Sequence, residues 1–145
     1  LILNVMIRKA PISMIMTEDV ITLKKTDNLE TAEQLFKRHK IRHIPVVRGD
    51  VIIGMLSYTD LLRLSFADIT NDDDDNSTDV MVYSMFTIEQ VMKRNVVSVS
   101  SSKSIKEVAE ILASKEFHAL PVVDNNSLSG IVTTTDLIKY LIKQF

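Results

Sequence analysis

An internal repeat restricts the possible folds of this chain more than any other sequence feature. Residues 16–62 align with residues 92–138 without a gap, at a constant offset of 76 positions. A repeat of this regularity indicates two copies of one supersecondary unit. The identical pairs are Met16/Met92, Val20/Val96, Pro45/Pro121, Val46/Val122, Val47/Val123, Gly54/Gly130, Thr59/Thr135, Asp60/Asp136 and Leu61/Leu137. They cluster in a Pro-Val-Val segment and a Gly-x-x-Ser/Thr-x-x-Asp segment, which are therefore the first places to look for function.

Length and composition indicate a small globular protein and give no support for nucleic-acid binding or for a membrane span. A chain of 145 residues suits one compact domain, or two small units that share a core. A formal charge of −2 gives no electrostatic footprint for nucleic acid. The absence of cysteine excludes disulfides and thiolate metal sites and fits a cytoplasmic protein. No apolar run approaches the ~20 residues that a membrane span needs. Because the sequence begins at Leu1, it is compatible with a piece of a longer protein.

Each copy predicts a β-α-β-β-α unit, and the fold class is therefore α/β (α+β). In the first copy, residues 20–23 predict a strand, and Asp27 or Asn28 caps a helix whose apolar stripe is Leu29, Ala32, Leu35 and Phe36. Further strands are predicted at 44–47 and 51–56, with a turn at 48–50 and a helix at 57–64.

The second copy predicts the same order of elements. Strands are expected at 96–99, 120–123 and 128–132, with a turn at 124–126. Ser104 and Glu107 form a capping-box pattern before the stripe Ile105, Val108, Ala109, Ile111 and Leu112. The last helix starts at Thr133 and carries Leu137, Ile138, Leu141 and Ile142, while short helices precede the copies near 12–16 and 88–92.

Four adjacent aspartates separate the two copies, in residues 71–77. Like charges repel, so we interpret this segment as a solvated linker. Carboxylate ligands for a hard cation are the alternative, but the spacing of a calcium loop is missing. The sequence thus divides into 1–65, an acidic linker at 66–85, and 86–145. Each unit leaves one apolar sheet face open, so we expect the two to pack by pseudo-twofold symmetry through their small sheets, creating two equivalent clefts.

The duplicated Gly-x-x-Ser/Thr-x-x-Asp segment is the candidate binding motif. Gly54 and Gly130 let the backbone approach another group closely. The hydroxyls of Ser57 and Thr133 lie where a helix begins, a position that suits a phosphate. Asp60 and Asp136 follow one turn later, where a carboxylate can accept two hydrogen bonds from a vicinal diol such as that of ribose.

Helix capping explains the same residues without any ligand. Ser/Thr-x-x-Asp is close to a capping box, which stabilises a helix by about 1 kcal/mol. A second feature favours a ligand, because Arg42 and His118 stand three residues before the shared prolines, and His43 follows Arg42. A basic side chain leading into a buried strand is unusual unless it lies at the mouth of a cleft, although a surface position at the turn is the simpler alternative.

The ordered set of motifs resembles a tandem pair of CBS domains, often called a Bateman module. The resemblance extends from about residue 11 to residue 141. It implies a non-catalytic regulatory module that binds adenosine-containing ligands (AMP, ADP, ATP or S-adenosylmethionine) in clefts between the repeats and signals to a fused or partner protein. No cofactor is required, and no metal site or catalytic residue is implied. The alternative is a structural or protein-interaction module with vestigial, unliganded clefts.

The resemblance also implies roles for individual residues. Asp60 and Asp136 would hold ribose hydroxyls, and Ser57 and Thr133 would face phosphate or ribose. Residues of the first strand of each copy would line the adenine pocket, and Arg42 and His118 occupy a phosphate-contacting position. The complete candidate set is Ile21, Thr22, Arg42, His43, Ser57, Thr59, Asp60, Val97, Ser98, His118, Thr133, Thr135 and Asp136.

The two copies differ at positions next to the motif residues. Ala119 replaces His43, and Thr134 replaces Tyr58, so the two sites are expected to differ in binding. The resemblance further implies a homodimer in which exposed faces of the motif helices make contact. Nucleic acid is a disfavoured ligand because the charge balance gives it no support. Catalysis by this chain alone is disfavoured because the motifs offer a site but no reactive group.

Overall fold

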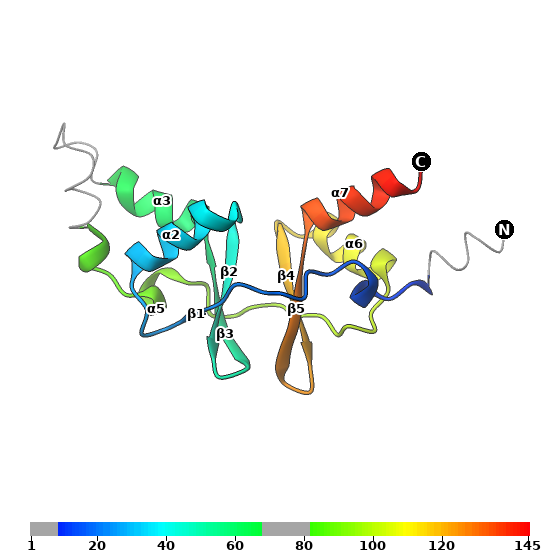
Figure 1. Cartoon of the computed structure of the whole chain (residues 1–145), viewed down its shortest axis with the longest axis horizontal. Coiled ribbons are helices and arrows are strands. Elements are labelled where there is room, and N and C mark those ends of the chain that lie inside the picture. The colour runs from blue at the N-terminus through cyan, green and yellow to red at the C-terminus, as the bar shows by residue number, and fades with distance from the viewer. Residues whose placement is uncertain (1–8, 68–81) are drawn as a thin grey trace. The chain divides into compact units, whose positions relative to one another are not determined.

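The computed structural model describes residues 9–67 and 82–145. The chain divides into two compact units, one formed by Leu1–Val20 with Val97–Phe145 and the other by Ile21–Val96. The expected acidic linker at 71–77 lies outside the described residues. Each unit is a small α/β assembly, which agrees with the predicted fold class (Figure 1).

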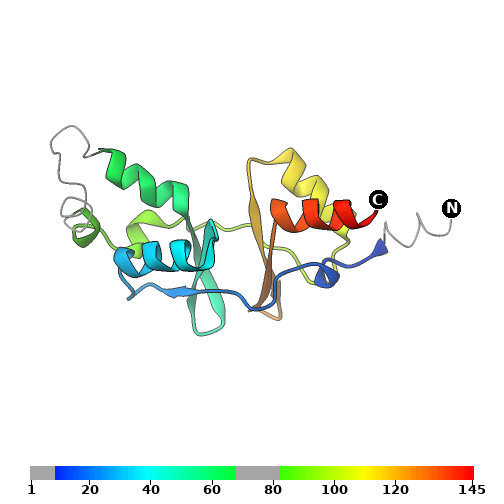
Figure 2. The ribbon, with the colours of Figure 1, turned by 45° about the horizontal axis from the view of Figure 1, so that its top comes forward.

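The unit Ile21–Val96 contains a three-stranded sheet in the order β1-β2-β3. Strand β1 runs parallel to β2, and β2 runs antiparallel to β3. Helices α2 and α3 lie side by side at the end of the β2–β3 hairpin opposite its turn (Figures 1 and 2). The bounds are β1 Leu23–Lys24, α2 Leu29–His39, β2 His43–Arg48, β3 Val51–Ser57, α3 Tyr58–Ala67 and α5 Ile88–Val91.

The other unit repeats this arrangement with a two-stranded antiparallel sheet of β4 and β5. A single parallel bridge joins Val99 to Val122, at the position where β1 pairs with β2 in the first repeat. The bounds are η1 Ile12–Met14, α6 Ile105–Ser114, β4 Ala119–Asp124, β5 Ser127–Thr133 and α7 Thr134–Lys143.

The predicted first strands are shorter than the sequence suggested. Residues 20–22 and 96–98 were expected in strands, but the pairing begins at Leu23 and at Val99. The reason is local. The amide of Val20 donates to the carbonyl of Glu18, and the amide of Val96 donates to that of Arg94, so the backbone curls before it reaches the sheet.

The helices begin where their capping residues predict. Of the two candidates for capping α2, Asn28 accepts from the amide of Thr31 at 2.8 Å, while Asp27 accepts from the amide of Lys24 and closes the preceding turn. Ser104 caps α6 by accepting from the amide of Glu107 at 3.1 Å. The Glu107 carboxylate accepts from the Ser104 hydroxyl instead of from a backbone amide, so the predicted capping box is only half formed.

The predicted apolar stripes form the core of each unit. Leu29, Ala32 and Phe36 are fully buried in the core that includes residues of β2 and β3, and Leu35 packs against this core. In the other unit Ile105, Val108 and Leu112 are buried on β4 and β5. The stripe of α7 behaves differently. Leu137 packs against the core, but Ile138, Leu141 and Ile142 are 52%, 56% and 65% exposed.

The two β-hairpins have the same register, and each carries one bulge. Val46 pairs with Gly54 and Val47 with Ile52, so Ile53 is the extra residue of β3. The shift recurs in the second hairpin between Val122 and Val123. A bulge bends the strand and increases its twist. The duplicated register shows that the sequence repeat is a repeat of structure.

The duplicated glycines lie where another segment of the chain crosses the bulged strand. A Cβ on Gly54 would lie 2.3 Å from Met92 Sδ, and a Cβ on Gly130 would lie 2.8 Å from Met16 Sδ. The backbones of Met55 and Lys93 exchange two hydrogen bonds of 2.9 Å, and Ile131 pairs with Thr17 in the same way. The close approach predicted for the glycines is therefore to a neighbouring segment of the protein.

Because of this crossing, the two compact units do not contain the same residues as the two sequence repeats. Met92 and α5 belong to the core around the first repeat, and η1 and Met16 belong to the core around the second. The predicted boundaries at 65 and 86 follow the sequence repeat. In the structure, α5 precedes the second repeat in sequence but belongs to the unit of the first, and η1 precedes the first repeat but belongs to the unit of the second. The pairing of Met with Gly, which occurs in both repeats, follows from this exchange.

Candidate functional site

In the first repeat, the predicted site residues gather at one end of the sheet. The carbonyl of Arg42 accepts from the amide of Tyr58 at 2.8 Å, which ties the start of β2 to the start of α3. His43 lies opposite Ser57 in the β2–β3 ladder. Because β1 and β2 are parallel, Ile21 and Thr22 approach the sheet from this same end. The unit Ile21–Val96 thus brings together all the candidates predicted for the first repeat.

The start of α3 is built around the Ser57 hydroxyl. The amide of Asp60 donates to Ser57 Oγ at 3.0 Å, which caps the helix. Arg63, one turn further along, donates from Nη1 to Asp60 Oδ1 at 3.2 Å. The side chain of Arg63 is 74% exposed, whereas that of Asp60 is 15% exposed. The ion pair therefore lies at the edge of the site, and the carboxylate lies further inside.

One oxygen of Asp60 has no partner. Within residues 9–67 and 82–145, Asp60 Oδ2 is the buried side-chain atom for which no hydrogen bond is found. Leaving a buried acceptor unsatisfied costs about 1–3 kcal/mol, and more when the group is charged. Such an atom in a folded protein requires an explanation, and a hydroxyl-bearing ligand is one.

The second repeat uses the corresponding residues differently. The amide of Asp136 donates to Thr133 Oγ1 at 3.1 Å, and the amide of Thr133 donates to Asp136 Oδ2 at 3.0 Å. This is a complete capping box, the structural alternative that the sequence left open. The carbonyl of His118 accepts from the amide of Thr134 at 3.0 Å and from its hydroxyl at 3.3 Å. His118 is thereby tied to α7 as Arg42 is tied to α3.

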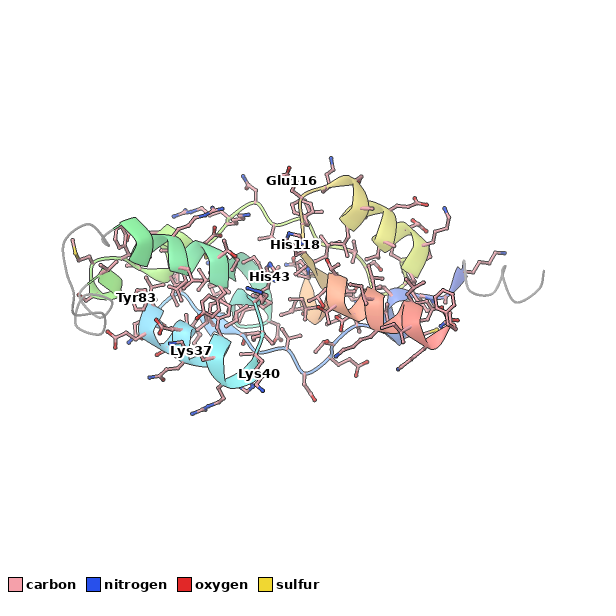
Figure 3. The ribbon with its side chains drawn as sticks, turned by 90° about the horizontal axis from the view of Figure 1, so that it is seen from above. Lys37, Lys40, His43, Tyr83, Glu116 and His118 are labelled. Carbon is pink, nitrogen blue, oxygen red and sulfur yellow. The ribbon has the colours of Figure 1, made fainter. Side chains whose placement is uncertain are left out.

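Several predicted residues present exposed side chains. Ile21 and His43 are partly buried. The exposed residues are Thr22, Arg42, Thr59, Val97, Ser98, His118 and Thr135. Figure 3 labels His43 at the start of β2 and His118 directly before β4. The unit that contains α7 holds all the candidates of the second repeat, which are Val97, Ser98, His118, Thr133, Thr135 and Asp136. The two predicted sets therefore separate cleanly, one set to each unit.

Tyr58 and Thr134, which differ between the repeats, have structural roles. The rings of Tyr58 and Phe36 lie 5.1 Å apart at an angle of 41°, so Tyr58 packs on the core of its unit. Thr134 binds the His118 carbonyl instead. The difference between Tyr58 and Thr134 is therefore explained, at least in part, by their contacts beside the motif.

Sequence reasoning missed two residues near the motifs. The first is Arg63, whose spacing of three residues from Asp60 on one helix face could have revealed the ion pair. The second is Asp124, at the end of β4. It accepts from Ser129 Oγ at 2.7 Å and from the amide of Ser101 at 3.0 Å, and it fixes the segment that follows the predicted adenine-pocket residues. The hydrogen bond from Ser129, followed by that from the Ser101 amide, lowers the pKa of the Asp124 carboxyl.

The described residues hold neither a metal-binding cluster nor a membrane-spanning helix. No group of three or more His, Cys, Asp or Glu side chains there is arranged to hold a metal ion. None of the helices in that part of the chain is long and apolar enough to cross a bilayer.

Comparison with known proteins supports the motif assignment. The family model described as "CBS domain" matches residues 12–67 and 88–143. YhcV, a CBS domain-containing protein of Bacillus subtilis, is 31% identical over 122 residues, which cover 84% of this chain and 79% of YhcV. The uncharacterized protein MJ1225 of Methanocaldococcus jannaschii is 30% identical over 125 residues, 86% of this chain.

Some relatives are much longer than this chain. The matched region is 44% of MJ1225. In a homoserine O-acetyltransferase of Methanohalobium evestigatum, 28% identical over 146 residues, it is 26% of the protein. The chain therefore resembles a module that occurs alone in some proteins and as a part of others.

Solved structures share the fold. CBSX2, crystallised in complex with AMP, has a TM-score of 0.75 and 22% identity and covers 93% of this chain and 98% of its own. The CBS domain pair of MJ0100, in complex with 5′-methylthioadenosine and S-adenosyl-L-methionine, has a TM-score of 0.76 and 22% identity, covering 94% and 98%. With the family model matched twice in tandem and the duplicated fold in place, this chain belongs to the CBS domain family.

Proposed function

We propose that this chain is a non-catalytic regulatory module that binds adenosine-containing ligands through its motif residues. The ligand would be AMP, ADP, ATP or S-adenosylmethionine, with the ribose diol on the aspartate and the adenine against residues 21–22 or 97–98. Ligand binding would be signalled to a fused or partner protein in the cytoplasm. No cofactor is needed for this role.

The observation that carries the proposal is the unpartnered Oδ2 of Asp60. A buried carboxylate oxygen beside a helix N-terminus accepts a hydroxyl hydrogen strongly, because the bond is charge-assisted. One such bond, at roughly 1.5–3 kcal/mol, is enough to make a ribose hydroxyl a main contributor to affinity.

The solved relatives support adenosine as the shared part of the ligand. AMP, 5′-methylthioadenosine and S-adenosylmethionine, bound in CBSX2 and MJ0100, differ in the group attached at the 5′ position. They have in common the adenine and the ribose with its two hydroxyls. An aspartate that binds the diol suits all three ligands. Other residues must then bind the 5′ group, and Arg42 and His118 are the candidates.

A thermal-shift panel tests the proposal. The full chain would be heated with AMP, ADP, ATP, S-adenosylmethionine and NAD, and with uridine monophosphate as the control for the base. A ligand at 100 times its Kd stabilises the folded state by about 2.7 kcal/mol. For a chain of this size we expect a rise in Tm of several degrees with at least one adenosine ligand. No rise with any of them at millimolar concentration contradicts the proposal.

A protein-interaction module is the second candidate, and the exposed face of α7 favours it. Ile138, Leu141 and Ile142 are more than half exposed on one helix. Apolar groups gathered on a surface are typical of a contact with another protein. A homodimer formed through this face is compatible with either function.

Charge substitution on α7 tests the dimer. Leu141→Glu would place a carboxylate on that face, so we expect sedimentation velocity to show a dimer for the original chain and a monomer for the variant. Lys139→Glu, on the same helix but outside the apolar set, is the control. A monomeric original chain would contradict the dimer, and a dimer insensitive to adenosine ligands would favour the interaction module over the regulatory one.

A further inference from the structure

We infer that the two duplicated aspartates are not equivalent, and that Asp60 is the carboxylate ready to receive a ribose while Asp136 serves mainly as a helix cap. This inference rests on the proposed function and goes beyond it by assigning the tighter site to the first repeat. The two aspartates belong to the same motif, and one sequence difference beside them is Arg63 in the first repeat against Lys139 in the second.

The hydrogen bonds of Asp60 leave a complete oxygen for a ligand. Oδ1 accepts from Arg63 at 3.2 Å, and Oδ2 is buried without a partner among the described residues. The cap of α3 uses only the Ser57 hydroxyl and the Asp60 amide. A ligand hydroxyl can therefore bind Oδ2 without breaking any bond that stabilises the fold.

The hydrogen bonds of Asp136 tie its carboxylate to the backbone. Oδ2 accepts from the amide of Thr133 at 3.0 Å, which closes the capping box of α7. A ligand hydroxyl that binds Oδ2 of Asp136 must share or displace this backbone bond, whereas Oδ2 of Asp60 carries no such bond. The affinity of the second site is reduced by the stabilisation that the cap loses.

Arg63 supports the difference between the sites. Its exposed guanidinium binds Oδ1 alone, which orients the carboxylate with Oδ2 inward. Lysine occupies the equivalent position in the second repeat, at Lys139, and no ion pair between Lys139 and Asp136 is found in the part of the chain that the structure describes. We therefore treat Arg63 as a positioning residue for Asp60.

Alanine at each aspartate separates the two roles. In the absence of ligand, Asp136→Ala should lower Tm by about 3 °C, the loss expected for one cap. Asp60→Ala should leave Tm unchanged or raise it, because the substitution removes a buried acceptor that has no partner. In isothermal titration with the adenosine ligand that stabilises the original chain most, Asp60→Ala should weaken the tightest site by about tenfold or more. Asp136→Ala should weaken it several times less. Asp60→Asn, which keeps the shape of the side chain, should weaken it as well.

Controls make each outcome decisive. Thr87→Ala removes a capping box outside the motif and should lower Tm while leaving the Kd unchanged. Equal losses of affinity at Asp60 and Asp136, or a larger loss at Asp136, overturn the inference but leave the proposed function intact. A destabilised Asp60→Ala with unchanged affinity overturns the inference in favour of a purely structural aspartate. If no adenosine ligand binds the original chain, the proposed function fails and the inference fails with it.

Discussion

Gly54 and Gly130 illustrate how an identical residue in both repeats can have a reason other than ligand binding. Their missing side chains make room for Met92 and Met16, and the carbonyls of Lys93 and Thr17 lie 2.9 and 2.8 Å from the position of an added Cβ. Backbone atoms held in a bridge cannot move away easily. The identity of these glycines is therefore explained by packing, whereas the carboxylate of Asp60 is not.

Alanine at Gly54 should destabilise the protein for this reason. We expect Gly54→Ala to lower the free energy of unfolding by about 1–3 kcal/mol, as overpacked sites do, measured by urea denaturation. Gly49→Asn is the matched control. Gly49 has φ +62° in open space, a conformation that asparagine tolerates, so this variant should stay close to the original stability. Equal stability of Gly54→Ala and the original chain would contradict the crossing of the two segments.

The carboxyl of Asp124 should make stability depend on pH. Its folded-state pKa is lowered, chiefly by the hydrogen bond from Ser129, so ionised Asp124 stabilises the fold above the ordinary carboxyl pKa of about 4. This contribution is lost as the pH falls through the lower, folded-state pKa. Asp124→Ala should therefore lower Tm at pH 7, and its difference from the original chain should shrink below about pH 4. A difference that is the same at both pH values would contradict this role.

The helices and hairpins are the part of the fold that the sequence predicted best, because their signals are local. The caps Asn28, Ser104 and Thr133 and the stripes behind them all lie within a few residues of the elements they specify. The turn at Asn125 and Asn126, with φ of 49° and 67°, is likewise specified locally, because asparagine tolerates a positive φ. The first strands were overestimated because their pairing depends on where the backbone meets β2 and β4.

The sequence singled out candidate site residues, but it did not predict their hydrogen bonds. The carbonyls of Arg42 and His118 accept from the amides of Tyr58 and Thr134 at the start of α3 and α7, a contact that the position of these residues before the prolines did not predict. The difference between Asp60 and Asp136 depends on which donor each carboxylate meets, and the shared motif does not specify that donor. The exchange of η1 and α5 between the units was also beyond sequence reasoning, because it depends on contacts between distant segments.

The cap of α5 provides a test at the level of an element. Thr87 and Gln90 form a reciprocal capping box on a helix of only four residues, which leads directly into Met92 and Lys93. Thr87→Ala should cost about 1 kcal/mol of stability in thermal denaturation, while Thr87→Ser, which keeps the hydroxyl, should cost much less. Similar losses for both variants would indicate that the methyl group, and not the cap, is what matters.

At the scale of the whole molecule, the exchanged segments make the two repeats depend on each other. Ile88 and Met92 belong to the core around the first repeat although they follow it in sequence. A chain cut after residue 85 would separate them from that core. The linear division of the sequence and the cooperative folding units therefore need not coincide.

Two fragments, residues 1–85 and 86–145, test this dependence. We expect each alone to give the poorly dispersed amide spectrum of an incompletely folded chain, and their mixture to recover dispersed signals. Fragment 1–85 loses the burial of Ile88 and Met92, which contribute roughly 1.5–3 kcal/mol each. A fragment that folds alone with the stability of the full chain would show that the exchange contributes little.

We propose that this CBS pair binds adenosine ligands at the end of the sheet where α3 begins. The most direct measurement is an amide ¹H–¹⁵N NMR titration of the full chain with AMP and S-adenosylmethionine, with uridine monophosphate as the control. We expect saturable shifts at Ser57, Asp60 and Arg42 with an adenosine ligand, and none with the control. No saturable shift at these amides, or shifts confined to other parts of the chain, would contradict this proposal.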